Sequence, residues 1–302
     1  MHKSQDIVVR KLGKTFAAEV IGFDLSSEPA AASAKRVWEL IEQYYVVCIR
    51  NQHFTHEEFI RFSQQMGPLE DYIDEEKTKG TAAIYNVGNT GPDGSTLPPD
   101  DPRVRAQATN VVWHTDSSYR DIPASLSLLF GREVLPPEAP GGETEFSDMM
   151  AAYEGLPEAM QKKLAPLHMV HSIVNARRLF DLAPVTPAQL DAVPSSCHPV
   201  IRVHPDRGGR CSLFFSGNVA REVGGVPLKE GQKLHDVLME HANHPDYTYR
   251  HRWQVGDLLI WDNRVTMHRA VPYELTKYRR MLERTTVAGT GPVLGPFSST
   301  VA

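Results

Sequence analysis

The stretch DLLIWDNRVTMHRA (residues 257–270) joins an apolar strand, a turn and a second segment that carries a histidine. The run DLLIWD (257–262) predicts a buried strand, and Asp262-Asn263 directly after it is typical of a turn. Short apolar segments of the same kind recur along the last two thirds of the chain: SLSLLF (125–130), HPVIRVH (198–204), SLFFSG (212–217), YTYRHRW (247–253) and MLERTTV (281–287). Helices are predicted between them near 147–164 and 229–242. Many short strands with long excursions indicate a mainly β protein, an antiparallel barrel or jelly roll with flanking helices.

The N-terminal part alternates helices and strands. Residues 34–45 place apolar side chains at helical spacing, and VVCIR (46–50) predicts a buried strand. Thr55 with Glu58 three residues later is the pattern of a capping box, so a second helix is predicted to begin there. It is predicted to end at Gly67-Pro68.

Residues 71–110 differ in composition from the rest of the chain. They are rich in Asp, Glu, Gly, Pro and Thr, with one apolar patch, AAIYNV (82–87). A loop of this length in a compact enzyme is typically a lid or a substrate loop. We therefore expect one domain over residues 1–302, with 71–110 as a substrate or lid loop and a mobile tail at 290–302.

The bulk composition excludes several classes of protein. The chain has 302 residues and a formal net charge of -5, which gives no reason to expect nucleic acid or an anionic membrane as a partner. Its three cysteines form no C-x-x-C pair, which argues against a thiolate zinc site or a disulfide scaffold. No apolar run approaches the length needed to cross a bilayer, and the N-terminal stretch MHKSQDIVVRKLGK lacks an apolar signal core. A cytoplasmic protein is expected.

Trp113-His114-Thr115-Asp116 is the sharpest local signal for a metal site. In an extended segment, residues two apart point to the same side, so the His114 and Asp116 side chains converge. With His268 as third ligand, two imidazoles and one carboxylate would form the triad of non-haem Fe(II) oxygenases. The alternative is a hydrogen-bonded His-Asp pair at a strand end. Two other H-x-D pairs, His204/Asp206 and His244/Asp246, contain proline and favour turns, and no H-E-x-x-H motif is present.

Two arginines near the C-terminus suggest anion binding. In a strand, Arg280 and Arg284 share one face. Two arginines on the inner face of a barrel are costly unless anions neutralise them, and guanidinium grips carboxylates in a bidentate manner. The alternative is a surface strand whose arginines form ion pairs.

Taken in order, these motifs resemble a known family. W-H-T-D, G-G-E-T-E-F (141–146), W-D-N-R-x-x-x-H-R-A and R-x-x-x-R-T-T follow one another as in the taurine dioxygenase/herbicide dioxygenase (TauD/TfdA) family. The resemblance extends to an N-terminal G-x-D-L segment (22–25) and to F-S-x-x-M-G-P-L (62–69). It implies a double-stranded β-helix, which agrees with the jelly roll expected from the strand pattern.

The resemblance also implies roles for individual residues. His114, Asp116 and His268 would bind Fe(II), while Thr144 and Arg284 would bind the distal carboxylate of 2-oxoglutarate. Arg280 would bind the substrate's anionic group, and Trp113 would line the iron site. Asn86, where the segment 71–110 meets the barrel, is predicted to contact the substrate anion. The implied cofactors are Fe(II), 2-oxoglutarate and O2, with ascorbate as an assisting reductant, and a homo-oligomer is expected.

The sequence restricts the substrate class less closely than it restricts the family and its cofactors. GGETEFSDMMAAYEGLP and RHRWQVGDLLIWDNR look closer to the aryloxyalkanoate branch than to the taurine branch. Hydroxylation next to the ether oxygen would then release a phenol, a 2-oxo acid, succinate and CO2. Three alternatives remain: a sulfonate or alkylsulfate dioxygenase, a zinc hydrolase on a similar barrel, and a barrel that binds metal without catalysis. Neither a zinc hydrolase nor a barrel that binds metal without catalysis would need two separate arginines for anion binding.

Overall fold

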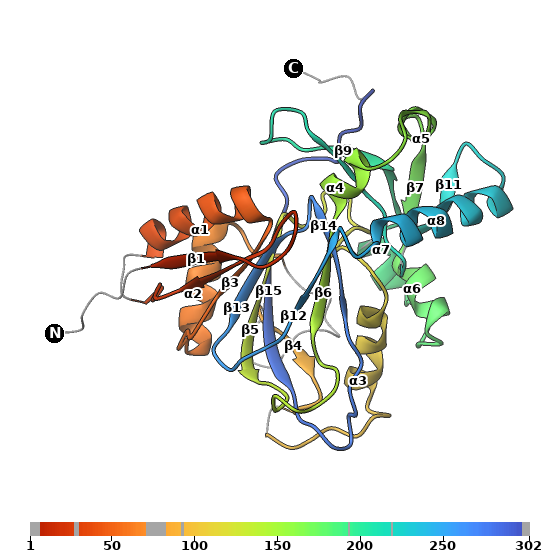
Figure 1. Cartoon of the computed structure of the whole chain (residues 1–302). Helices are drawn as coiled ribbons and strands as arrows, with labels where there is room; N and C mark the ends of the chain where they lie inside the picture. Colours follow the sequence, from red (N-terminus) through yellow and green to blue (C-terminus); the bar gives the residue numbers. More distant parts are fainter. Residues whose placement is uncertain are drawn as a thin grey trace.

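The computed structural model describes residues 7–26, 30–70, 83–91, 94–192, 194–218 and 220–297. Two facing sheets form a jelly roll at its centre (Figure 1). The larger sheet has seven strands, in the spatial order β1 (Val8–Lys11), β2 (Ala18–Ile21), β3 (Val46–Ile49), β13 (Leu258–Asp262), β5 (Leu126–Glu133), β15 (Met281–Val287) and β4 (Tyr85–Gly88). The smaller sheet consists of β12 (Thr248–His251), β6 (Thr144–Asp148) and β14 (Thr266–Ala270).

Further strands and helices surround this centre. Outside the two facing sheets lie the strands β11 (Ala220–Gly224), β7 (His168–His171) and β8 (Ser196–Pro199) in one sheet, and β10 (Cys211–Leu213) with β9 (Ile201–Val203) in another. The helices are α1 (Ala30–Tyr44), α2 (His56–Met66), α3 (Pro102–Ala106), the 3-10 helix η2 (Gln107–Val111), α4 (Met149–Glu154), α5 (Glu158–Leu164), α6 (Ile173–Leu179), α7 (Pro187–Ala192) and α8 (Leu228–Ala242). The mainly β architecture with flanking helices is thus confirmed.

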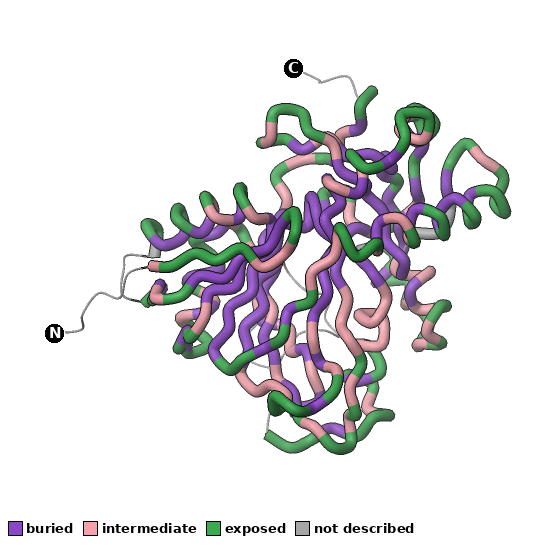
Figure 2. Tube along the Cα trace, viewed as in Figure 1, coloured by how far each residue is buried: buried purple, intermediate pink, exposed green. Residues whose placement is uncertain are grey.

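The larger sheet is apolar on both faces because helices cover one face and the smaller sheet covers the other. On β13, Leu258 and Ile260 pack toward α1 and α2, whereas Leu259 and Trp261 pack toward Phe146 of β6. This alternation follows from the two-residue period of a strand. In Figure 2 the central strands are almost wholly buried, while the outer turns of α1 are exposed.

The N-terminal predictions are confirmed. α1 and β3 occupy the predicted ranges, and α2 begins with the predicted capping box. Thr55 Oγ1 accepts a hydrogen bond from Glu58 N at 3.2 Å, and Thr55 N donates to Glu58 Oε2 at 2.8 Å. The helix ends at Gly67 as predicted.

Two strand predictions were too long. HPVIRVH (198–204) forms β8 and β9 in different sheets, because Val200 between them bonds the backbone of Leu167 and Phe214 instead. SLFFSG (212–217) contributes only the end of β10. The helix expected over 147–164 is two helices, α4 and α5, separated at Gly155-Leu156-Pro157.

The segment 71–110 is not one continuous loop. Residues 71–82 and 92–93 lie outside the described residues, but β4 adds an edge strand to the larger sheet, and α3 and η2 follow. The apolar patch at 82–87 was the sequence signal for β4. A lid or substrate role for this segment stays a prediction.

Within the described part of the chain, none of the helices combines the length and apolarity that crossing a membrane requires. In the C-terminal segment 290–302, residues 298–302 lie outside the described part, while the Leu294 carbonyl accepts a hydrogen bond from Val203 N at 2.7 Å. Mobility of this tail stays a prediction.

The capping box makes a testable contribution to stability. Replacing Thr55 with Ala should lower the free energy of unfolding by about 1 kcal/mol, because the Glu58 backbone N–H at the start of α2 loses its side-chain acceptor. The midpoint of urea unfolding would measure this change, with Thr276→Ala in an exposed turn as the control. Equal midpoints for Thr55→Ala and wild type would contradict the assignment.

Candidate active site

His114, Asp116 and His268 come together inside the jelly roll. His114 and His268 exchange both backbone hydrogen bonds, at 2.9 and 2.7 Å, which places their side chains on one face. Asp116 Oδ1 lies 3.9 Å from His114 Nε2, and its Oδ2 lies 3.7 Å from His268 Nε2. These separations are too long for hydrogen bonds, and one potential ligand atom from each residue lies within 4.8 Å of the others. The geometry suits three donors around a cation better than a hydrogen-bonded His-Asp pair.

The two imidazoles are neutral and oriented as metal ligands. His114 Nδ1 lies 2.8 Å from the Val112 carbonyl, so Nδ1 carries the proton and the Nε2 lone pair faces the carboxylate. The His268 ring lies against Phe146 and Trp261. Burial lowers the pKa of His114 and, with the neighbouring imidazole, lowers the pKa of His268 well below its usual value. Neutral imidazole is the form that binds metal.

Asp116 is held as a carboxylate. Burial alone would raise its pKa, but the charge of Arg284, with the hydrogen bond from Ser127, outweighs burial and holds this pKa well below its usual range. Arg284 Nη1 lies 2.9 Å from Oδ1, and Ser127 Oγ donates to Oδ2 at 2.6 Å. The charge and position of this ligand are therefore fixed before any metal is present.

Asn263 supports this carboxylate and was missed as a site residue. Its Nδ2 donates to Ser127 Oγ at 2.9 Å, and its Oδ1 accepts from Trp261 Nε1 at 3.0 Å. Asn263 Oδ1 also lies 3.4 Å from the backbone N of Asp116. The sequence identified only a structural turn here. Polar residues directly after the buried strand were the available signal.

Thr144 is the first residue of β6 and is buried. Its Oγ1 accepts a hydrogen bond from Trp253 Nε1 at 3.0 Å. Gly141 and Gly142, just before it, both have positive φ, 83° and 80°. A Cβ on Gly141 would lie 2.0 Å from the Pro272 carbonyl oxygen, so only glycine allows this close approach.

Arg280 is a buried cation, 4% exposed, without an ion-pair partner among the described residues. Its backbone N donates to Asn89 Oδ1, and its side chain lines a small pocket together with Trp253. Burial lowers its pKa to about 10, against weaker opposing effects of Tyr273 and Glu143. A guanidinium in this setting is costly unless an anion compensates it.

Arg284 borders the three ligand residues, but Asn86 does not. Beyond its contact with Asp116, the Arg284 guanidinium lies 4.8 Å from the ring centroid of Tyr85 on β4. Tyr85 is directly opposite Arg284 in the sheet, and Asn86 is opposite Glu283. Opposed residues share a face, so Asn86 points to the helix-covered face, away from the ligands. The expected Asn86 contact is thus corrected: Tyr85 is the β4 residue that faces the site.

Trp113 lies beside the ligands in sequence but packs on the other side of the segment. It is buried in a cluster with Met267 and Phe215, and the Arg269 guanidinium carbon lies 4.8 Å from its ring centroid. Because neighbours in an extended chain point to opposite sides, Trp113 and Met267 both point away from the histidines that follow them. This packing supports the His114–His268 backbone pair.

The other H-x-D pairs form turns, as predicted. His204 Nδ1 accepts a hydrogen bond from Asp206 N at 3.1 Å, and His244 Nδ1 accepts one from Asp246 N at 3.3 Å. In both turns the histidine Nδ1 accepts from the backbone of the aspartate two residues on, and His204 Nε2 also lies 3.4 Å from Asp262 Oδ2.

Comparison with known proteins agrees with this geometry. Residues 9–286 match the family described as "Taurine catabolism dioxygenase TauD, TfdA family". The chain belongs to the TauD/TfdA family. As a member of this family it is an α-ketoglutarate-dependent dioxygenase, and the resemblance seen in the sequence is confirmed.

Three relatives illustrate the match. The chain is 33% identical to "Alpha-ketoglutarate-dependent 2,4-dichlorophenoxyacetate dioxygenase" of Cupriavidus pinatubonensis, over 93% of this chain and 98% of the relative. It is 30% identical to "(S)-phenoxypropionate/alpha-ketoglutarate-dioxygenase" of Sphingobium herbicidovorans, over 93% and 94% of the two chains. The crystal structure of AAD-2 in complex with Mn(II) and N-oxalylglycine superposes with a TM-score of 0.85 at 33% identity, covering 96% and 99% of the two chains.

The metal site can be tested by binding alone. Asp116→Asn should weaken Mn(II) binding by about 100-fold or more, and Ser127→Ala by roughly tenfold, because the first removes the anionic donor and the second its orienting hydrogen bond. Calorimetric titration would measure both affinities. Asp246→Asn, in an exposed His-Pro-Asp turn, is the matched control. Wild-type affinity in Asp116→Asn would exclude Asp116 as a ligand.

Proposed function

We propose that this TauD/TfdA-family enzyme binds Fe(II) through His114, Asp116 and His268 and hydroxylates an aryloxyalkanoate with 2-oxoglutarate and O2. The observation that carries the proposal is the buried triad, with two neutral imidazoles and one carboxylate separated by distances that suit a cation. Two histidines and one carboxylate on one face are the ligand set of non-haem Fe(II) oxygenases. The donor set and its neutral imidazoles fit this metal.

The metal and cosubstrate supply the oxidising chemistry. When bound, Fe(II) with 2-oxoglutarate and O2 supplies oxidative decarboxylation to succinate and CO2, coupled to transfer of one oxygen atom to a substrate C–H bond. The protein's part is to hold the reactants in position, to compensate their charges and to exclude water.

The geometry favours a division of the two arginines opposite to that implied by the resemblance. Trp253 donates a hydrogen bond to Thr144 and lines the same small pocket as Arg280, which supports placing Thr144 and Arg280 at one anion site. Arg284 instead lies against Asp116, where a reacting C–H bond would have to be held. We therefore assign the distal carboxylate of 2-oxoglutarate to Arg280 and Thr144. The carboxylate of the substrate is assigned to Arg284.

The substrate class follows from the site and from the relatives. Arg284 offers a cation for a carboxylate, and Tyr85 lies beside it with an aromatic face. Both curated relatives described above are named for aryloxyalkanoate substrates. Hydroxylation of the carbon between the ether oxygen and the carboxylate gives a hemiacetal. This hemiacetal loses the phenol and leaves a 2-oxo acid, so all atoms of substrate and oxygen are accounted for. A sulfonate or alkylsulfate substrate is less favoured.

The activity can be tested by succinate formation from 2-oxoglutarate with Fe(II) and ascorbate. Phenoxyacetates and phenoxypropionates should stimulate turnover and release phenol in equal amount, whereas taurine and alkylsulfates should not. His114→Ala should abolish both products because one ligand is lost. Phenol release without succinate would reject the dioxygenase assignment, and stimulation by taurine alone would reject the substrate class.

The two arginines can be separated by their Michaelis constants. Arg280→Gln should raise KM for 2-oxoglutarate roughly 10- to 100-fold, because a charge-assisted hydrogen bond is lost. Arg284→Gln should raise KM for the aryloxyalkanoate by a similar factor. Arg279→Gln is the matched control, since Arg279 is adjacent in sequence but exposed and paired with Glu133. The reverse pattern would restore the roles implied by the resemblance.

A further inference from the structure

The motif Arg250-His251-Arg252-Trp253 includes two side chains that the proposed reaction has not used. Trp253 is buried, and its Nε1–H donates to Thr144 Oγ1 at 3.0 Å. An indole nitrogen can only donate, whereas a hydroxyl carries one proton and two lone pairs. The bond therefore occupies a lone pair of Thr144 and leaves its proton to point elsewhere. No acceptor for that proton lies within the described residues, so Thr144 is left as a hydrogen-bond donor.

The indole ring is fixed by its neighbours. The His251 ring meets it edge-on, with centroids 4.9 Å apart and planes at 89°. Gly131 on β5 allows the ring to pack closely, because a Cβ on Gly131 would lie 3.3 Å from Trp253 Cε3. Trp253 thus has little freedom to rotate away from Thr144.

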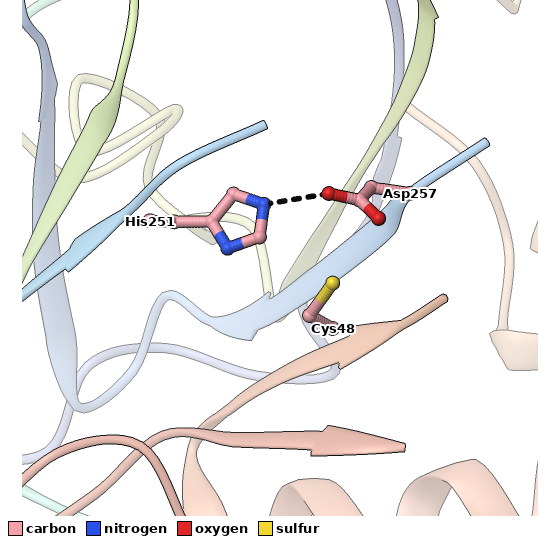
Figure 3. Close-up of side chains that lie close together, drawn as sticks. All are labelled: Cys48, His251 and Asp257. Atoms are coloured by element: carbon pink, nitrogen blue, oxygen red, sulfur yellow. Dashed lines mark hydrogen bonds and ion pairs between the residues drawn. The ribbon is translucent and has the colours of Figure 1, made fainter. Parts of the chain in front are cut away.

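His251 is in turn fixed by a buried carboxylate. His251 Nε2 lies 3.1 Å from Asp257 Oδ2 (Figure 3). Tyr249 Oη lies 3.2 Å from His251 Nδ1. Burial lowers the pKa of His251, so the ring is neutral. Nε2 then donates to Asp257, and Nδ1 accepts from the Tyr249 hydroxyl. Arg50 Nη1, at 2.6 Å, neutralises the Asp257 charge.

Cys48 completes this cluster, which resembles a second cation site. Its sulfur and one ligand atom each of His251 and Asp257 lie within 4.8 Å of one another. Figure 3 shows the side chains of His251 on β12, Cys48 on β3 and Asp257, directly before β13, lying close together. However, Asp257 Oδ2 already accepts bonds from Arg50, His251 and Gln254 N, and burial raises the pKa of the Cys48 thiol well above its usual value. A cation would have to lie near a guanidinium and remove that proton, so the cluster is a hydrogen-bonded anchor.

We propose that Trp253 is a positioning residue: it orients the Thr144 hydroxyl so that its proton is donated to the distal carboxylate of 2-oxoglutarate. Asp257 and His251 hold the indole in place for this purpose. The inference rests on the proposed role of Thr144. The sequence motifs identify only residues that would contact 2-oxoglutarate directly. The proposal adds two side chains, Trp253 and His251, that act through Thr144.

The test is a double-mutant cycle on 2-oxoglutarate binding to the Mn(II)-loaded enzyme, measured by calorimetry. Trp253→Phe removes the N–H but keeps an aromatic ring and should weaken binding about two- to tenfold, the effect of one neutral hydrogen bond. Thr144→Val should weaken binding by at least as much. In a Thr144→Val background, Trp253→Phe should have no further effect, and in Thr144→Ser it should keep its effect. The aryloxyalkanoate KM should not change.

Two further variants make the cycle decisive. Trp38→Phe removes an indole hydrogen bond to the Met66 carbonyl, far from this site, and should leave 2-oxoglutarate affinity unchanged. Gly131→Ala keeps the Trp253 N–H but crowds the Gln254 carbonyl at 3.1 Å and Trp253 Cε3 at 3.3 Å, so it should weaken 2-oxoglutarate binding in the same direction as Trp253→Phe if that variant does not fold.

The outcomes distinguish the role of Thr144 in 2-oxoglutarate binding from the positioning role of Trp253. Unchanged affinity in Thr144→Val would reject the role of Thr144 itself. Weaker binding in Thr144→Val with wild-type binding in Trp253→Phe, or additive effects of the two changes, would reject the role of Trp253 alone. Binding of a second metal equivalent that Cys48→Ala abolishes would show that the anchor is a cation site and overturn the positioning role.

Discussion

The two backbone hydrogen bonds exchanged by His114 and His268 are the constraint on which the site depends. They bring together segments more than 150 residues apart in sequence and turn both imidazoles to one side. Asp116 then reaches the same point because it follows His114 by two residues in the same extended segment. On the opposite side, Trp113 and Met267 pack into one cluster, so the apolar core holds the pair closed. The His114–His268 backbone pair therefore determines both the packing of the core on one side and the position of the site residues on the other.

Sequence alone predicted the mainly β fold and the convergence of His114 with Asp116, because each rests on a local periodicity, whereas His268 was added from a distant segment. The period of two in strands identified β5, β13 and β15, and spacing identified His114 with Asp116. Long-range partners carried no such signal. Asn263 supports Asp116 through Ser127, which precedes it by 136 residues, and nothing in a single sequence indicates that contact. The prediction of one strand over 198–204 was wrong at Val200 for the same reason, since a change of sheet depends on partners distant in the chain.

The face of a residue was predictable only where the strand was recognised. Asn86 was assigned to the site because β4 was taken as part of a loop, and the register with β15 turns it to the helix-covered face. For the arginines, the sequence pattern assumed one regular strand with both side chains on one face, but Arg280 lies just before β15. A register shift between Met281 and Leu282 lies between them. It gives Arg280 surroundings, namely Trp253 and a buried pocket, that are unlike those of Arg284 beside Asp116.

Charge balance links these observations to the substrate. With a divalent metal in place, the metal, Asp116, Arg280 and Arg284 together carry three positive charges in a buried site, while the nearby Glu70 has its own partner in Arg120 at 3.7 Å. 2-Oxoglutarate brings two negative charges, so one remains to be compensated. A monoanionic substrate on Arg284 completes the balance, whereas a neutral substrate would leave a buried charge without a counterion, at a cost of several kcal/mol. With the metal in place, the charges of Arg280 and Arg284 thus favour the binding of two separate anions, and this balance supports the proposed oxygenase of small carboxylates over a barrel that only binds metal.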